Sequence, residues 1–92
     1  MDIKRKKKLR GIANRMDALY QIGKNEVTAN TLDMLDKALT AREMVKISIL
    51  KTVDTPIREL ALDLCADLKA ELVQIIGRCV ILYRESDQHL YL

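Results

Sequence analysis

Three stretches of the chain repeat their apolar residues at the spacing of one helix face. The cleanest begins at Ile57 and returns at i+3, i+4, i+7, i+8 and i+11. Asp2, Thr28 and Thr55 stand where N-caps are expected, and Pro56 would take the first position of the third helix. The expected helices cover about residues 2–17, 29–41 and 56–70.

Four shorter stretches have the pattern of strands. Residues 44–50 alternate between apolar and polar positions, which predicts a half-buried strand with Lys46 and Ser48 on its polar side. Near the end of the chain, two runs rich in Val and Ile are separated only by Gly77-Arg78, which predicts a type II′ hairpin. The expected strands are residues 18–22, 44–50, 72–76 and 79–83.

These elements follow one another as α-β-α-β-α-β-β and predict an α/β fold. Helices between strands imply parallel pairing of the first three strands, and the hairpin makes the last strand antiparallel. We expect a single domain over residues 1–92, with a four-stranded mixed sheet and a frayed polar tail at residues 85–92. Three helices on one face give two layers and an open face bearing Lys46 and Ser48.

The composition narrows the function classes. No apolar run approaches the roughly 20 residues that span a bilayer, and no apolar segment follows the basic N-terminus as in a signal peptide. Cys65 and Cys79 are isolated within apolar patterns, which favours buried reduced thiols over a disulfide or a metal site. The single histidine, His89, lies in the polar tail. We therefore expect a cytoplasmic, non-catalytic protein with no metal, cofactor or small-molecule substrate.

Positive charge is concentrated at the N-terminus. Residues 1–15 have a net charge of +6, whereas the rest of the chain has −3. This distribution favours a polyanion as partner, nucleic acid before a membrane surface, because the apolar stripe lies in the later half of the helix and not beneath the charges. The candidate phosphate ligands are Lys4, Arg5, Lys6, Lys7, Lys8, Arg10 and Arg15.

A second candidate is the turn that contains Gly23, Lys24 and Asn25, between an expected strand and the helix that Thr28 caps. Backbone N–H groups, a helix N-terminus and a lysine can converge on one anion there. On its own, the turn is better explained as a structural turn with a solvated lysine.

The hairpin supplies a third candidate. Arg78 would contact phosphate or stack on a base from the tip of the turn, and Arg84 would extend that surface. An ordinary exposed turn arginine is an equal alternative for Arg78.

Taken together, these stretches resemble the CRM domain, the chloroplast RNA splicing and ribosome maturation module, in its single-domain bacterial form. The resemblance covers nearly the whole chain. It rests on the basic helix Lys4–Ala13, on Gln21–Asn25 with Val27-Thr28, on Val45–Ile47, and on Glu71–Arg78 followed by Val80 and Leu82–Arg84.

The resemblance implies a fold like the C-terminal domain of translation initiation factor 3 with an added N-terminal helix. It also implies RNA binding without catalysis, on precursors of the large ribosomal subunit. The family's Gly-x-x-Gly loop is likened to the backbone clamp of KH domains. Gly23 matches this loop, but Glu26 replaces its second glycine, which would weaken the clamp and shift binding to the basic helix.

We therefore predict a monomeric protein that binds ribosomal RNA. The alternatives are a module that docks on a ribosome-associated protein through the open sheet face, and a nonspecific DNA- or membrane-binding protein. The full set of predicted RNA-binding residues is Lys4, Arg5, Lys6, Lys7, Lys8, Arg10, Arg15, Gly23, Lys24, Asn25, Thr28, Lys46, Gly77, Arg78 and Arg84.

Overall fold

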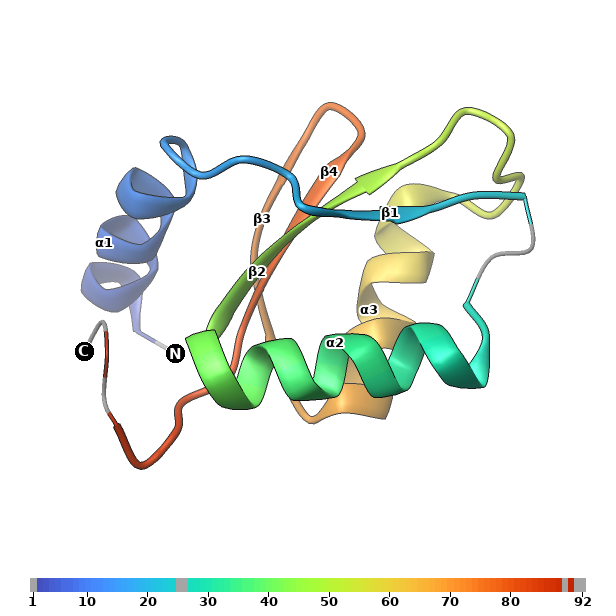
Figure 1. The fold of residues 1–92 in the computed structure, drawn as a ribbon. Coiled ribbons are helices and arrows are strands. Elements are labelled where there is room, and N and C mark those ends of the chain that lie inside the picture. Colours follow the sequence, from blue (N-terminus) through green and yellow to red (C-terminus); the bar gives the residue numbers. More distant parts are fainter. Residues whose placement is uncertain (1, 25–26, 89, 91–92) are drawn as a thin grey trace.

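A computed structural model describes residues 2–24, 27–88 and 90 of the protein (Figure 1). The α/β class and the element order match the sequence prediction. The elements are α1 (Ile3–Ala13), β1 (Tyr20–Ile22), α2 (Ala29–Arg42), β2 (Met44–Ile49), α3 (Ile57–Leu68), β3 (Glu71–Ile76) and β4 (Cys79–Tyr83).

The four strands form one mixed sheet in the order β1-β2-β4-β3. β1 pairs with β2 in parallel, and β4 is antiparallel to both of its neighbours. β3 therefore runs in the same direction as β1 and β2, as expected, but the prediction that the first three strands pair with one another is wrong for β3. The reason lies in β4, where Val80, Ile81, Leu82 and Tyr83 are all buried. A strand that is apolar on both faces is stabilised in the interior of a sheet.

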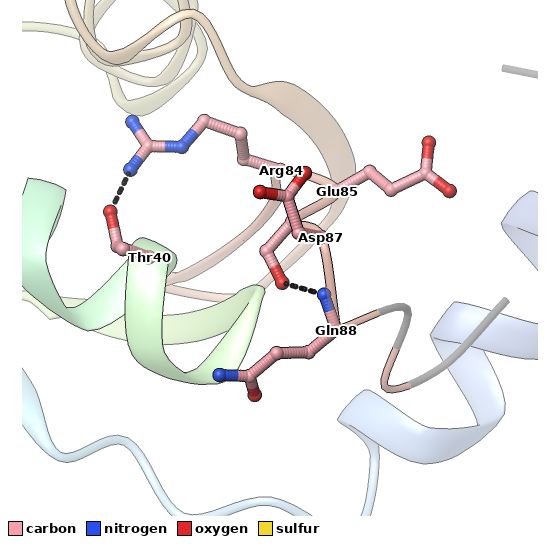
Figure 2. Close-up of a pocket in the computed structure, with 6 residues that line it drawn as sticks. Thr40, Arg84, Glu85, Asp87 and Gln88 are labelled. Atoms are coloured by element: carbon pink, nitrogen blue, oxygen red, sulfur yellow. Dashed lines mark hydrogen bonds between the residues drawn. The ribbon is translucent and has the colours of Figure 1, made fainter.

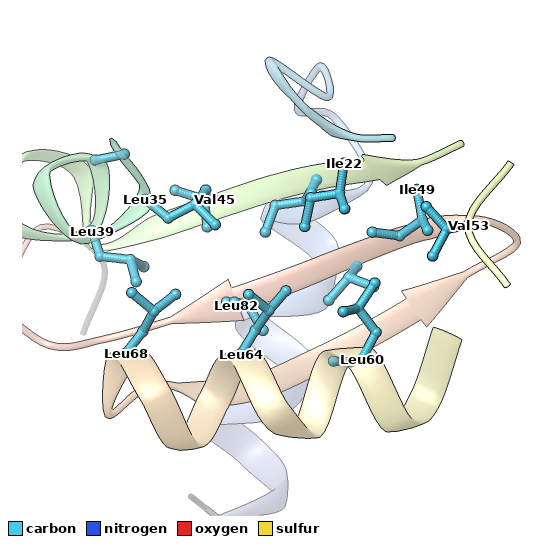
Figure 3. Packing of buried hydrophobic residues seen from close by; sticks show 14 residues of the cluster. Ile22, Leu35, Leu39, Val45, Ile49, Val53, Leu60, Leu64, Leu68 and Leu82 are labelled. Carbon is cyan, nitrogen blue, oxygen red and sulfur yellow. The ribbon is translucent and has the colours of Figure 1, made fainter. Parts of the chain in front are cut away.

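The larger core lies between one face of the sheet and helices α2 and α3 (Figure 3). Leu35 and Leu39 from α2 and Leu64 from α3 are fully buried against this face. Val45 and Ile47, on the predicted apolar side of β2, belong to the same cluster. The alternation along β2 thus predicted correctly which side of the strand faces the main core.

Helix α1 packs on the opposite face of the sheet, so the prediction that all three helices share one face is wrong. Leu9 and Ala13 of α1 are fully buried in a second cluster, with Met44, Val73, Ile81 and Tyr83 from the strands. Figure 1 shows α1 set apart from α2 and α3 across the sheet. The apolar residues on the second face of β4 and β3 provide the surface on which α1 docks.

The expected open face is reduced to one row of side chains. Gln21, Ser48, Cys79 and Ile76 are paired in register across all four strands, so they lie on the same face as Lys46. Gln21 and Ile76 are exposed, and Ser48 and Cys79 are half-buried. This row lies towards the carboxyl ends of β1 and β2, beyond the part of the sheet that α1 contacts.

The helix starts agree with two of the three predicted caps. Asp2 and Thr28 accept hydrogen bonds from the backbone N–H groups of Arg5 and Thr31, at 2.8 and 3.1 Å. At α3, Pro56 itself occupies the cap position and makes no side-chain cap bond, so the assignment of Thr55 as N-cap is wrong by one residue.

Two residues of the segment after β4 are held by hydrogen bonds to the body of the protein. The buried carboxylate of Glu43 accepts hydrogen bonds from the backbone N–H groups of Ser86 and Leu90, both at 2.7 Å. Glu43 follows α2 with φ of 66°, a left-handed conformation that turns the chain into β2. Ser86 and Leu90 are therefore fastened to the turn between α2 and β2.

Candidate nucleic-acid interface

Helix α1 presents a dense set of cations to solvent because only a narrow side of it is buried. Leu9 and Ala13 face the sheet, and Ile12 and Met16 pack partly against the same cluster. The basic side chains leave the helix in the other directions, and Lys6 alone among them is half-buried. The exposed ones are Lys4, Arg5, Lys7, Lys8, Arg10 and Arg15.

Lys46 lies beneath the end of this helix. Its Nζ donates to the carbonyl oxygens of Ala13 and Met16, at 3.3 and 3.0 Å. A cation at this position complements the negative end of the helix dipole. Lys46 therefore fixes α1 on the sheet, and two of its three donors point at protein oxygens.

The turn after β1 is held against the end of β2. The backbone N–H of Leu50 donates to the carbonyl of Ile22 at 2.9 Å, which extends the parallel pairing beyond the strands. A Cβ atom at Gly23 would lie 3.3 Å from Cδ1 of Leu50, so this glycine allows a close approach between the two segments. Lys24 is exposed beside it, and Thr28 caps α2 a few residues later. Asn25 and Glu26 lie outside the described residues.

The β3–β4 hairpin reaches the same end of the sheet. Gly77 has φ of +55° and Arg78 has no positive φ, as a type II′ turn requires. The Nε and Nη2 atoms of Arg78 donate to the carbonyls of Ile49 and Leu50, both at 2.8 Å. Leu50 thus links the hairpin to the Gly23 turn. The predicted loop residues are brought together, but Arg78 uses part of its guanidinium to hold them there.

Arg84 lies at the other end of the sheet, and its guanidinium is occupied by protein oxygens. Nη1 donates to Oδ1 of Asp36 and to the carbonyl of Leu68, both at 2.8 Å. Nη2 donates to the carbonyl of Asp36 and to Oγ1 of Thr40, and Figure 2 shows the latter bond at the wall of a cavity of about 310 Å³. This side chain joins the end of α3 to α2, so we leave it out of the binding surface proposed below.

One exposed cation at the loop end was not singled out from the sequence. Lys51 follows Leu50 directly and is exposed beside the Gly23 and Gly77 turns. A lone lysine after a strand carries no recognisable signal. Only the pairing of Ile22 with Leu50 brings it next to Gly23.

The described residues offer little for catalysis. Burial, and then the negative charge of Glu71, raise the pKa of the Cys65 thiol above its usual 9.0, which disfavours a reactive thiolate. Within residues 2–24, 27–88 and 90, no group of three or more His, Cys, Asp or Glu side chains is placed to hold a metal ion. In the same part of the chain, no helix is both long and apolar enough to cross a bilayer.

Comparison with known proteins identifies the family. The sequence profile of the CRS1 / YhbY (CRM) domain matches residues 1–84. The chain belongs to the CRM domain family. This confirms the resemblance that the basic helix, the Gly23 turn and the Gly77-Arg78 hairpin indicated.

Individual CRM relatives are similar over nearly their whole length. The chain is 34% identical to "Probable RNA-binding protein YqeI" of Bacillus subtilis, over 94% of this chain and 90% of the relative. It is 28% identical to an "RNA-binding protein" of Haemophilus influenzae, over 96% of this chain and 89% of the relative.

A solved CRM-like structure supports the same fold. The solution structure of SAV1595 from Staphylococcus aureus, a hypothetical protein considered a candidate for RNA binding, superposes with a TM-score of 0.78. The two sequences are 37% identical, and the match covers 91% of this chain and 88% of that one.

Proposed function

We propose that this CRM protein is a cytoplasmic, monomeric, non-catalytic RNA-binding protein that binds ribosomal RNA during assembly of the large subunit. Family membership and the names of its relatives support the RNA-binding part. The observation that carries the proposal is the structure of α1. The helix buries only its narrow apolar side and exposes the basic residues that crowd its sequence. Such a surface binds a phosphate backbone largely through charge.

The structure supports a route for RNA from α1 to the Gly23 turn. Lys46 touches the last carbonyls of α1, and Ser48 lies two residues farther along the same face of β2. Two strand residues span about 7 Å, close to the spacing of one nucleotide. Ser48 pairs with Gln21, which is two residues before Gly23. A strand of RNA that runs from α1 to Lys24 therefore crosses Ser48 and Gln21, the two polar residues of this row.

The Gly23 turn supplies the second contact in this proposal. Its components are the exposed Lys24 ammonium, the glycine that permits close approach, and the N-terminus of α2 that follows. Helix N-termini and backbone N–H groups favour an anion. Lys51 adds an exposed cation beside the turn, and the part of Arg78 that faces Leu50 keeps the segments together.

The alternative, docking of a protein on the open sheet face, has less support. Helix α1 covers Met44, Ile81 and Tyr83 on that face, which leaves the single row described above. Ile76 is the one large apolar side chain exposed in this row. A stable protein interface generally needs a larger apolar centre.

The proposal is tested by binding of a fluorescent fragment of large-subunit ribosomal RNA over a range of salt concentrations. We expect the triple variant Lys7→Gln, Lys8→Gln and Lys24→Gln to bind about a hundredfold more weakly at 0.1 M salt, because three phosphate contacts are lost. The matched control removes the same charge from exposed positions elsewhere, with Lys37→Gln, Arg42→Gln and Lys69→Gln.

We expect this control to bind nearly as the wild type does. Equal losses in both triple variants would show that only net charge matters, and binding no tighter than to an unrelated DNA duplex would contradict recognition of ribosomal RNA. Unchanged binding by the first variant would refute the assigned surface.

A further inference from the structure

A second cationic site lies at the edge of the sheet, away from the Gly23 turn. A cleft of about 440 Å³ opens between α1, β3 and the start of α3. Three basic side chains line it, Lys6 and Arg10 from α1 and Arg58 from α3, and none of the described acidic residues does. These helices lie on opposite faces of the sheet, so the cleft wraps around the outer edge of β3.

A β-bulge in β3 shapes this cleft. The register between β3 and β4 shifts between Leu72 and Gln74, which leaves Val73 as an extra residue. The Val73 side chain is buried beneath α1, and its carbonyl accepts a hydrogen bond from Nε of Arg10 at 3.3 Å. This bond fixes the arginine stem and leaves the two terminal nitrogens of the guanidinium available at the cleft.

The position of Arg58 is not explained by stability. It lies in the first turn of α3, where the helix dipole disfavours a positive charge. Its side chain is exposed and makes no hydrogen bond or ion pair within the described part of the chain. An anion in the cleft would offset both the dipole and the repulsion among the three cations.

The edge of β3 is also poorly suited to an added strand from another protein. The bulge interrupts the regular spacing of its backbone groups, and Arg10 already occupies the carbonyl of Val73. Both features discourage strand addition at a sheet edge. The polar lining and the positive charge instead fit phosphate groups.

We propose that this cleft, which we call the β3-edge cleft (Lys6, Arg10, Arg58 and Gln74), binds phosphates of a second segment of the bound RNA. The inference rests on the proposed RNA-binding function and adds Arg58 and Gln74 to the surface. Gln74 lines the cleft, and its Oε1 is buried and makes no hydrogen bond within the described part of the chain. That oxygen is an acceptor and does not bind phosphate, but the NH2 group of the same amide can donate to one, so its NMR signal reports on a ligand in the cleft.

The RNA would contact the protein on two sides of the sheet. The Gly23 turn follows β1, and the cleft borders β3 at the opposite edge of the sheet. Three strand spacings, about 14 Å, separate these edges, which corresponds to roughly two nucleotides of extended chain. A single strand longer than a few nucleotides can therefore reach both sites.

The test compares Arg58→Ala with Arg42→Ala, an exposed arginine in the last turn of α2 that gives the same change in charge. The probe is a fluorescein-labelled 12-nucleotide poly(U) RNA, measured by anisotropy as salt is varied. We expect Arg58→Ala to bind about fivefold more weakly at 0.1 M salt and to lower the salt slope by about 0.7, as for one lost single-strand phosphate contact. Arg42→Ala should leave both quantities near wild type.

A second measurement locates the contact. In an NMR titration of the wild-type protein with the same RNA, we expect the side-chain amide of Gln74 and the backbone amides of Val73 and Arg58 to shift. Equal affinities of the two variants, or no shift at Gln74 while RNA binds elsewhere, would refute phosphate binding in the β3-edge cleft. The proposed RNA-binding function would still stand. No binding of either this RNA or the ribosomal fragment by the wild type would overturn both.

Discussion

The two ends of the sheet carry similar residues and use them differently. At the loop end (residues 22–24, 49–51 and 76–79), Lys24 and Lys51 are exposed around two glycine turns. At the tail end (residues 36–44 and 83–90), Arg84 is surrounded by protein oxygens and Glu43 is fully buried. Arg84 and Glu43 at the tail end close the fold, whereas Lys24 and Lys51 at the loop end stay exposed. The same residue types therefore do not indicate the same role.

Among substitutions that test this comparison, the one at Glu43 should have the largest effect on stability. Replacement of Glu43 by Ala removes the acceptor of the backbone N–H groups of Ser86 and Leu90 and detaches the tail. Because hydrogen bonds to a buried carboxylate are charge-assisted, we expect the free energy of unfolding to fall by about 3 kcal/mol. Urea denaturation measures it, with Asp63→Ala, an exposed acid on α3, as the control. Equal small losses in both variants would mean that the tail contributes little to stability.

Arg84 gives the next effect and tests the division between the two ends directly. Arg84→Ala removes four hydrogen bonds to α2 and α3, and we expect about 2 kcal/mol of destabilisation. The affinity of the folded variant for RNA should stay within twofold of wild type, as measured by anisotropy below its melting temperature. Arg84→Lys should restore little stability, because an ammonium cannot reproduce the guanidinium fork. A large loss of affinity with normal stability would place Arg84 in the RNA surface.

At the loop end, replacing the glycines should have a smaller effect on stability. Gly77→Ala forces an alanine to adopt φ of +55° and should cost about 1 kcal/mol in unfolding free energy. Gly23→Ala should cost less, because its new Cβ meets only the flexible Cδ1 of Leu50 at 3.3 Å. The converse change, Lys69→Gly at φ of 54°, should stabilise the protein by up to about 1 kcal/mol. Thermal melts rank the three variants. A larger destabilisation by Gly23→Ala than by Gly77→Ala would contradict this account.

The smallest effect at neutral pH is expected at Tyr83, in the tail end. Its hydroxyl is buried and has no hydrogen-bond partner among the described residues, so Tyr83→Phe should change stability by less than about 1 kcal/mol. Burial, followed by the negative charges of Glu43 and Glu85, raises the pKa of Tyr83 above 10.

A raised pKa means that the unfolded chain loses this proton first as the pH rises. The contribution of the neutral tyrosine is therefore complete below about pH 10 and is lost progressively above it. Urea denaturation at pH 8 and pH 10.5 should show a smaller loss for Tyr83→Phe than for wild type. If wild type and Tyr83→Phe lose the same amount of stability, Tyr83 is excluded as the source of the loss.

Much of the fold could be predicted from local patterns. The alternation along residues 44–49 identified β2 and its buried side, and the stripe from Ile57 to Leu68 identified α3. Gly77-Arg78 located the hairpin because a two-residue turn needs a residue that tolerates positive φ. These features depend on neighbouring residues, so the sequence carries them in full.

The arrangement of the elements in space was harder to predict from the sequence. The apolar run from Val80 to Tyr83 indicated a strand, but its burial on both faces and its place between β2 and β3 were not inferred. That place leaves apolar residues on both sides of the sheet, and α1 covers the second side. The side of a sheet on which a terminal helix docks depends on contacts between distant residues, which no local period reveals.

The sequence by itself determined that this chain has a basic helix, a glycine-lysine turn and a glycine-arginine hairpin, because composition and spacing are local properties. Only the tertiary structure decided which charges are available to a ligand. It brings Arg58 beside Lys6 and Arg10, and it surrounds Arg84 with oxygens of α2 and α3. A charged side chain can bind a ligand only with donors that folding has left unpaired, and that is decided by residues far away in the chain.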